Sequence, residues 1–101
     1  MKTFNINNQT FTLEFKQGPI GAATIVRNQD SGEFTQTLVS ENIEKGGYYT
    51  KTFGIVNGQT FNSGIKEDTL SRDEALQFAK DQYDRLEKRL TESVTGDIFD
   101  R

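Results

Sequence analysis

The sequence contains no cysteine, no histidine and no tryptophan. Without cysteine the chain has no disulfide framework, thiol nucleophile or zinc knuckle. Without histidine it has no Ser–His dyad, no imidazole metal ligand and no side chain that ordinarily titrates near neutral pH. No apolar run approaches the roughly 18 residues of a membrane-spanning helix. These absences exclude the commonest catalytic and metal-binding arrangements, so we expect a non-enzymatic protein with no cofactor and no metal.

Basic residues are too few to indicate a strong attraction to nucleic acid. The 101 residues include 12 basic and 15 acidic ones, and the formal net charge is −3. The beginning of the chain, residues 1–5, lacks the long apolar stretch of a secretory signal. We therefore expect a single domain over residues 1–101. We expect it in the cytoplasm, which is the host cytoplasm if a phage encodes the chain.

An alternation of apolar and polar residues through the first two-thirds of the chain predicts β-strands. Phe11, Leu13 and Phe15 alternate with polar residues, which is typical of a strand with one buried face. Asn57-Gly58 predicts a two-residue hairpin turn, because both positions of such a turn need positive φ. The strands expected from this pattern cover residues 4–6, 10–16, 20–28, 33–40, 48–56 and 59–65.

A capped amphipathic helix is predicted after the strands, at about residues 72–94. Ser71 and Glu74 have the spacing of a capping box, in which each side chain bonds the other residue's backbone N–H. Gly96 can end this helix, and residues 97–101 then form a short tail. The fold class is therefore α+β, with an antiparallel sheet of five or six strands packed by one C-terminal helix. The helix residues expected to face the sheet are Leu76, Ala79, Tyr83, Leu86 and Leu90.

Phe78 interrupts the charged outer face predicted for this helix. Successive helix residues are about 100° apart, which separates Phe78 from the apolar stripe. An aromatic ring among charges is typical of a contact with a partner protein, while a helix flank packed by a loop or strand would also explain it. The candidate partner-binding residues of this face are Phe78, Asp81, Asp84, Arg85 and Lys88.

Two further aromatic positions are candidates for partner contacts. Tyr48 and Tyr49 point to opposite faces of a strand, so one should be buried and one exposed, and Tyr48 is taken as the candidate. Phe99 lies in the tail, where residues 95–100 resemble the short acidic–aromatic tails with which replication proteins dock partners. Folding of this tail back over the sheet is the alternative.

The segment from Gly47 to Leu90 combines a strand, an Asn-Gly turn, a second strand and a capped helix. It resembles the N-terminal arm-type DNA-binding modules of phage integrases, and also the sheet-and-helix single-strand binders of the Whirly and transcriptional-coactivator kind. The resemblance covers less than half of the chain and implies a sheet face that binds DNA. Those modules carry basic residues on the sheet, whereas the stretch from Tyr48 to Ile65 offers only Lys51.

The composition favours a non-enzymatic protein-binding module that acts by occupancy, such as an inhibitor of a host protein. Small proteins of phages and mobile elements that block host defence, anti-CRISPR proteins among them, often have this profile. An acidic helix face can occupy a basic groove that normally holds nucleic acid. The acidic residues expected to do so are Asp73, Asp81, Asp84, Glu87 and Glu92, partly offset by Lys80, Arg85, Lys88 and Arg89.

The expected partner is therefore a host protein or protein complex, including one that itself binds nucleic acid, and no membrane. The alternative is a nucleic-acid-binding module that uses the sheet face, through Lys2, Lys16, Arg27, Lys51 and a tyrosine. A steep dependence of binding on salt would distinguish this alternative. The residues leave open whether the chain forms a homodimer.

Overall fold

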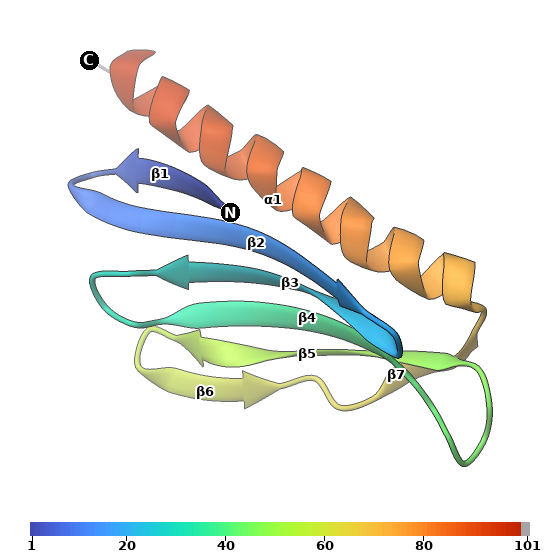
Figure 1. Cartoon of the computed structure of the whole chain (residues 1–101). Helices are drawn as coiled ribbons and strands as arrows, with labels where there is room; N and C mark the ends of the chain where they lie inside the picture. The colour runs from blue at the N-terminus through green and yellow to red at the C-terminus, as the bar shows by residue number, and fades with distance from the viewer. Residues whose placement is uncertain (100–101) are drawn as a thin grey trace.

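The structure, a computed structural model, describes residues 1–99, apart from the side chains at 67, 68 and 95–99. One antiparallel sheet and one long helix form two layers (Figure 1). The α+β class, the antiparallel sheet and the C-terminal helix are thus confirmed. The elements are β1 (Lys2–Ile6), β2 (Gln9–Gly18), β3 (Gly21–Asn28), β4 (Phe34–Glu41), β5 (Tyr48–Val56), β6 (Gln59–Asn62), β7 (Lys66–Leu70) and α1 (Arg72–Phe99).

Consecutive strands pair with one another from β1 to β6, as short turns favour. The predicted Asn57-Gly58 hairpin is confirmed, with φ of 53° and 76° at its two residues. The turn between β1 and β2 has the same form, because Asn7 and Asn8 also have positive φ. Asparagine tolerates this region better than most residues, since its short side chain can bond the local backbone.

The last predicted strand, 59–65, is shorter in the structure, where β6 ends at Asn62, and a strand that was not predicted, β7, follows it. Gly64 has a φ of 75°, and its N–H donates to the side-chain oxygen of Asn62 at 2.9 Å. This turn ends β6 and lets β7 pair with the other half of β5. The sheet therefore has seven strands, one more than the upper end of the predicted five or six. The helix also continues past Gly96, its predicted end, as far as Phe99.

The core lies between α1 and the face of the sheet that α1 covers, which we call the covered face (Figure 1). Its centre is made of small side chains, so the helix backbone approaches the strands closely. The Thr24 hydroxyl donates directly to the Ala79 carbonyl oxygen at 2.7 Å. Leu13 is fully buried, and the Phe15 ring meets the Tyr83 ring edge-on at 6.4 Å, as the predicted core requires. The central cluster is Ala22, Val39, Ala75 and Ala79.

The start of α1 is capped as the sequence predicted. The Glu74 N–H donates to the Ser71 hydroxyl at 3.1 Å, and the Ser71 N–H donates to the Glu74 carboxylate at 3.0 Å. Hydrogen bonding to the Glu74 carboxylate from the Ser71 backbone N–H, and secondly from the Ser71 side chain, lowers the pKa of this carboxyl below its ordinary value. Within the described residues, no helix is both long and apolar enough to cross a membrane.

Candidate functional site

Phe78 is not on the outer face of the helix, which corrects the sequence-based prediction. It is half-buried and packs against the central cluster. The reason is the small size of Ala75 and Ala79, which mark the centre of the buried stripe. At about 100° per residue, Phe78 and Leu76 lie about 80° to either side of that centre. Both side chains therefore reach the sheet from the flanks of a closely packed helix.

A groove of about 530 Å³ lies beside Phe78 at the start of the helix. Phe78 and Asp81, both predicted as parts of the partner-binding site on the helix, line this groove together. The Asp81 carboxylate accepts a hydrogen bond from the Gln77 amide at 2.8 Å. The lining residues are Leu70, Asp73, Glu74, Gln77, Phe78 and Asp81.

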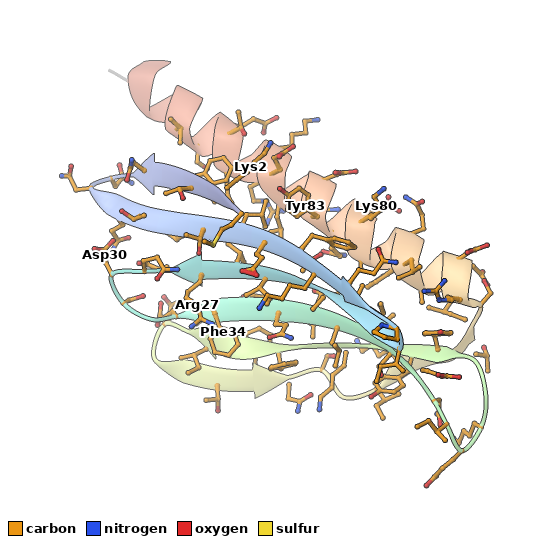
Figure 2. All side chains as sticks on the ribbon, viewed as in Figure 1. Lys2, Arg27, Asp30, Phe34, Lys80 and Tyr83 are labelled. Atoms are coloured by element: carbon orange, nitrogen blue, oxygen red, sulfur yellow. The ribbon has the colours of Figure 1, made fainter. Side chains whose placement is uncertain are left out.

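The other charged candidates on the helix do not gather into a site. Asp84, Arg85 and Lys88 are exposed, and within the described residues no ion pair joins Asp84 to Lys88 or Asp81 to Arg85. Glu87 instead pairs with Lys2 of β1, which raises the pKa of the lysine through its hydrogen bond and charge. Figure 2 shows Lys2 close to the helix. Lys2 is therefore on the covered side of the sheet.

Of Tyr48 and Tyr49, the structure places the one that was taken as the exposed candidate on the covered face. Tyr48 packs against the central cluster, so it belongs to the core and not to an exposed contact. Tyr49 faces the opposite side of β5 and lines a surface pocket. Phe99 is the last residue of α1, and its side chain lies outside the described part of the structure, as do Asp100 and Arg101.

The opposite face of the sheet, which we call the open face, is covered by no helix or loop layer of residues 1–99 (Figure 1). The register of the strands and the alternation of side chains define its members. Arg27, Phe34 and Ile55 form one row across neighbouring strands, and Ile25, Gln36 and Phe53 form the next. The open face of β2–β5 comprises Thr12, Glu14, Lys16, Ala23, Ile25, Arg27, Phe34, Gln36, Leu38, Ser40, Tyr49, Lys51, Phe53 and Ile55.

Aromatic rings and cations interleave on the open face. The Phe34 and Phe53 rings meet edge-on at 6.3 Å. The Arg27 guanidinium lies 5.1 Å from the centre of the Phe34 ring, and the Lys51 ammonium lies 5.7 Å from that of Phe53. Figure 2 places Arg27 and Phe34 on the neighbouring strands β3 and β4. A cation over a ring contributes about 0.5–1 kcal/mol at exposed sites, so these pairs hold the positive charges above the apolar surface.

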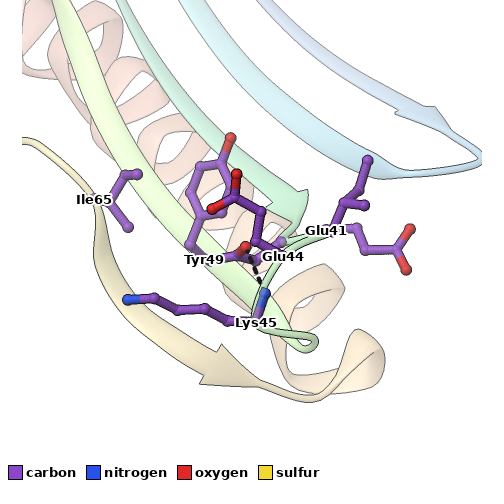
Figure 3. A pocket seen from close by; sticks show the side chains of 7 residues that line it. Glu41, Glu44, Lys45, Tyr49 and Ile65 are labelled. Atoms are coloured by element: carbon purple, nitrogen blue, oxygen red, sulfur yellow. Dashed lines mark hydrogen bonds between the residues drawn. The ribbon is translucent and has the colours of Figure 1, made fainter.

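Two hollows adjoin this surface at the end of the sheet where β3 and β5 begin. One of about 360 Å³ has a floor of small residues, Gly21, Ala23 and Ser40, beside Leu38 and Lys16. The other hollow, of about 520 Å³, is shown in Figure 3. In this view α1 lies behind the strands, so the hollow opens on the side of the sheet away from α1. Its walls come from the loop 42–47 and from Glu41, Tyr49 and Ile65.

The open face differs in charge from the whole chain. Strands β2–β5 place Lys16, Arg27 and Lys51 on it, against the single acid Glu14. Lys16 pairs with Glu14 at 3.3 Å, in an exposed contact. Among the described residues, no group of three or more acidic side chains is placed to hold a metal ion. The apolar side chains and three cations of the open face can bind a ligand by apolar contact and positive charge.

Sequence reasoning missed the apolar residues of the open face. Ile25, Phe34, Leu38 and Phe53 were recognised as strand residues, but their common face was not identified. The available signal was that β3, β4 and β5 carry apolar residues at both odd and even positions, and therefore on both faces. In β2, by contrast, apolar and polar residues alternate strictly. A strand that is apolar on both faces is either covered on both sides or leaves apolar surface for a partner.

No family model matches the chain, and comparison with curated proteins and with solved structures finds no significant match.

Proposed function

We propose that the chain is a non-enzymatic protein-binding module that acts by occupancy, with the open face as its binding surface. The observation that carries this proposal is that β3–β5 direct their large apolar side chains away from the helix. Ile25, Phe34, Leu38, Phe53 and Ile55 occupy the open face, and each is half-buried only by its neighbours. A contiguous apolar surface on a small protein is typical of an interaction site.

The layout of this surface supports a protein as the partner. Apolar and aromatic side chains occupy its centre, while Lys16, Arg27 and Lys51 lie around them. Protein interfaces have this anatomy, with a desolvated apolar centre that supplies most of the energy and a polar rim that supplies specificity. The sheet also holds the side chains on a rigid support, which lowers the entropy lost on binding.

Inhibition of a host protein is the biological role that we propose for this binding. A small chain without histidine or cysteine can block a target by covering a surface, because occupancy needs no catalytic group. The open face replaces the helix as the proposed contact surface. The charges predicted on α1 are scattered or paired within the protein.

Binding of nucleic acid through the same face is the second candidate. The observation that favours it is the placement of Lys16, Arg27, Lys51 and Tyr49 on one face. Lys2, the remaining predicted contact, lies on the covered side, paired with Glu87. Aromatic rings among cations can bind single strands by stacking and charge neutralisation.

Paired surface variants test which face binds. Tagged protein is used to capture partners from a lysate of the native host, with Phe53→Ser as the open-face variant and Arg85→Glu as the helix-face variant. Circular dichroism and melting temperature establish that both variants fold. We expect Phe53→Ser to lose a partner that the unmodified chain and Arg85→Glu both retain.

The opposite pattern, retention by Phe53→Ser and loss by Arg85→Glu, would return the binding surface to the helix. Nuclease treatment of the lysate separates the two candidate functions. A captured protein that survives nuclease supports the protein-binding function. Capture of nucleic acid itself, with binding that falls steeply as salt is raised, would support the second candidate instead.

A further inference from the structure

Two cations of the open face have no carboxylate partner among the residues whose side chains the structure describes. Arg27 and Lys51 each lie over a phenylalanine ring, and neither makes an ion pair with any described residue. Lys16 has only the exposed contact with Glu14. Exposed pairs of this kind contribute little stability and exchange readily. All three positive charges are therefore available to an incoming acidic group.

Lys16 lines a hollow of the open face, and the register of the strands places Lys51 beside Leu38, another residue that lines it. Lys16, Ala23, Leu38 and Lys51 form one row across β2, β3, β4 and β5. Ala23 and Leu38 line the hollow of about 360 Å³, together with Gly21 and Ser40. Neighbouring strands are about 4.8 Å apart, so Lys16 on β2 and Lys51 on β5, three strands away, are about 14 Å apart. An apolar side chain can enter between them.

This spacing matches an extended peptide that lies across the strands. Residues i, i+2 and i+4 of an extended segment project to the same side, and i and i+4 are about 13 Å apart. An apolar residue at i+2 would enter the hollow, and carboxylates at i and i+4 would meet Lys16 and Lys51. The flexible lysine stems accommodate the remaining difference.

Two other occupants fit less well. A second copy of this chain would bring the same three cations against one another, with only Glu14 to offset them. A nucleic acid would need free ring faces for its bases, but Arg27 lies over the Phe34 ring and Lys51 lies over the Phe53 ring. Of the open-face rings of β2–β5, Tyr49 remains for stacking. A protein carboxylate needs only the outward N–H groups of the cations.

We propose that the open face binds an acidic segment of a partner protein, in which an apolar side chain lies between two carboxylates. The apolar side chain occupies the hollow lined by Gly21, Ala23 and Leu38, and the carboxylates pair with Lys16 and Lys51. This inference rests on the proposed function, because it specifies the chemistry of the partner at the same face. It also gives a role to the three cations that β2, β3 and β5 place on this face.

A charge-swap experiment tests this chemistry. The probe is a short fluorescent peptide with aspartate at i and i+4, phenylalanine at i+2 and threonine between them, and its binding is measured by fluorescence anisotropy. We expect the double variant Lys16→Glu/Lys51→Glu to lose about tenfold or more in affinity. The control Lys80→Glu/Lys88→Glu changes the net charge equally on the helix and should bind as the unmodified chain does.

A second peptide, with lysine in place of each aspartate, makes the test independent of any damage to the fold. We expect it to bind the Lys16→Glu/Lys51→Glu variant better than it binds the unmodified chain. Equal loss in both double variants, or no binding of the aspartate peptide, would overturn the inference. So would oligothymidylate that displaces the peptide and binds more tightly.

Failure of this inference can be separated from failure of the proposed function. Host-partner capture that depends on Phe53 but is unaffected by Lys16→Glu/Lys51→Glu would leave the open face as the binding surface and reject the acidic segment. Capture that depends on Arg85 instead of Phe53 would reject both.

Discussion

The covered and open faces of strands β3–β5 divide their side chains by size. The covered face carries mainly alanine, threonine and valine, with Tyr48 as the large exception. The open face carries isoleucine, leucine and phenylalanine. Small residues let α1 approach closely enough for Thr24 to bond the helix backbone. The apolar bulk of these strands is thus directed away from the only layer that could cover it within the described chain.

The same two faces differ in how their charges are used. On the covered side, Lys2 is paired with Glu87 and contributes to holding β1 against the helix. On the open side, Arg27 and Lys51 are held over rings without a carboxylate. The covered side thus carries a cation that is paired with the helix, and the open side carries two cations that lie over rings. This difference supports the proposal that the open face binds a partner.

The largest expected change in the free energy of unfolding comes from placing the same substitution, leucine to alanine, on each of the two faces. Leu13 is fully buried on the covered face, so Leu13→Ala should lower the free energy of unfolding by about 2–5 kcal/mol. Leu38 is half-buried on the open face, so Leu38→Ala should cost less than half as much. Denaturant midpoints of both variants measure the difference. Equal losses would mean that the open face is as much a core as the covered one.

Phe78 offers the next largest effect and tests the corrected position of its side chain. Because the ring packs against the central cluster while remaining half-buried, Phe78→Ala should lower the free energy of unfolding by about 1–3 kcal/mol. Phe53→Ala, on the open face, should cost less than about 1 kcal/mol in the free protein. Urea titrations of the two variants decide the matter. A negligible loss for Phe78→Ala would restore the ring to the outer surface.

The sheet and the capped helix could be predicted because their signals are local. The strict alternation of β2 and the Asn57-Gly58 turn each depend on a few neighbouring residues. The capping box of Ser71 and Glu74 forms as its spacing indicates. The short strand β7 was missed because Gly64 redirects the chain by a turn whose effect depends on which part of β5 is free to pair.

The sequence carried a signal for a second apolar face in β3–β5, but which face is open depends on tertiary packing. Tyr48 and Tyr49 alternate in any strand, but only the position of α1 decides which of them is covered. The same holds for Phe78, since the closeness of the helix depends on alanines in α1 and on small residues in three strands. Rows such as Lys16, Ala23, Leu38 and Lys51 need the register, which joins residues far apart in the sequence.

A smaller effect is expected at the contact that joins the covered face to the helix. Thr24→Val keeps the shape of the side chain but removes the hydrogen bond to the Ala79 carbonyl. We expect a loss of about 0.5–1.5 kcal/mol in the free energy of unfolding. Thr60→Val, at an exposed position of β6, is the matched control and should be close to neutral. Thermal unfolding that ranks the control as the more damaging change would contradict the role of this bond.

The smallest effect concerns the first turn of the helix that creates the covered face. Hydrogen bonds from Ser71 lower the pKa of the Glu74 carboxyl in the folded protein. The carboxylate therefore stabilises the fold at pH values above the ordinary glutamate pKa. This contribution is lost as the pH falls through the lowered pKa of the folded state, because both states then bind the proton.

The variant Glu74→Gln isolates this titration, because its amide can still accept the Ser71 N–H but carries no charge toward the positive end of the helix dipole. We expect the unmodified chain to be slightly more stable than Glu74→Gln at neutral pH, and the difference to vanish in acid. Unfolding midpoints of both proteins, measured from neutral pH to below the glutamate range, give the comparison. A difference that stays constant across this range would show that the Glu74 charge plays no part in holding the helix start over the sheet.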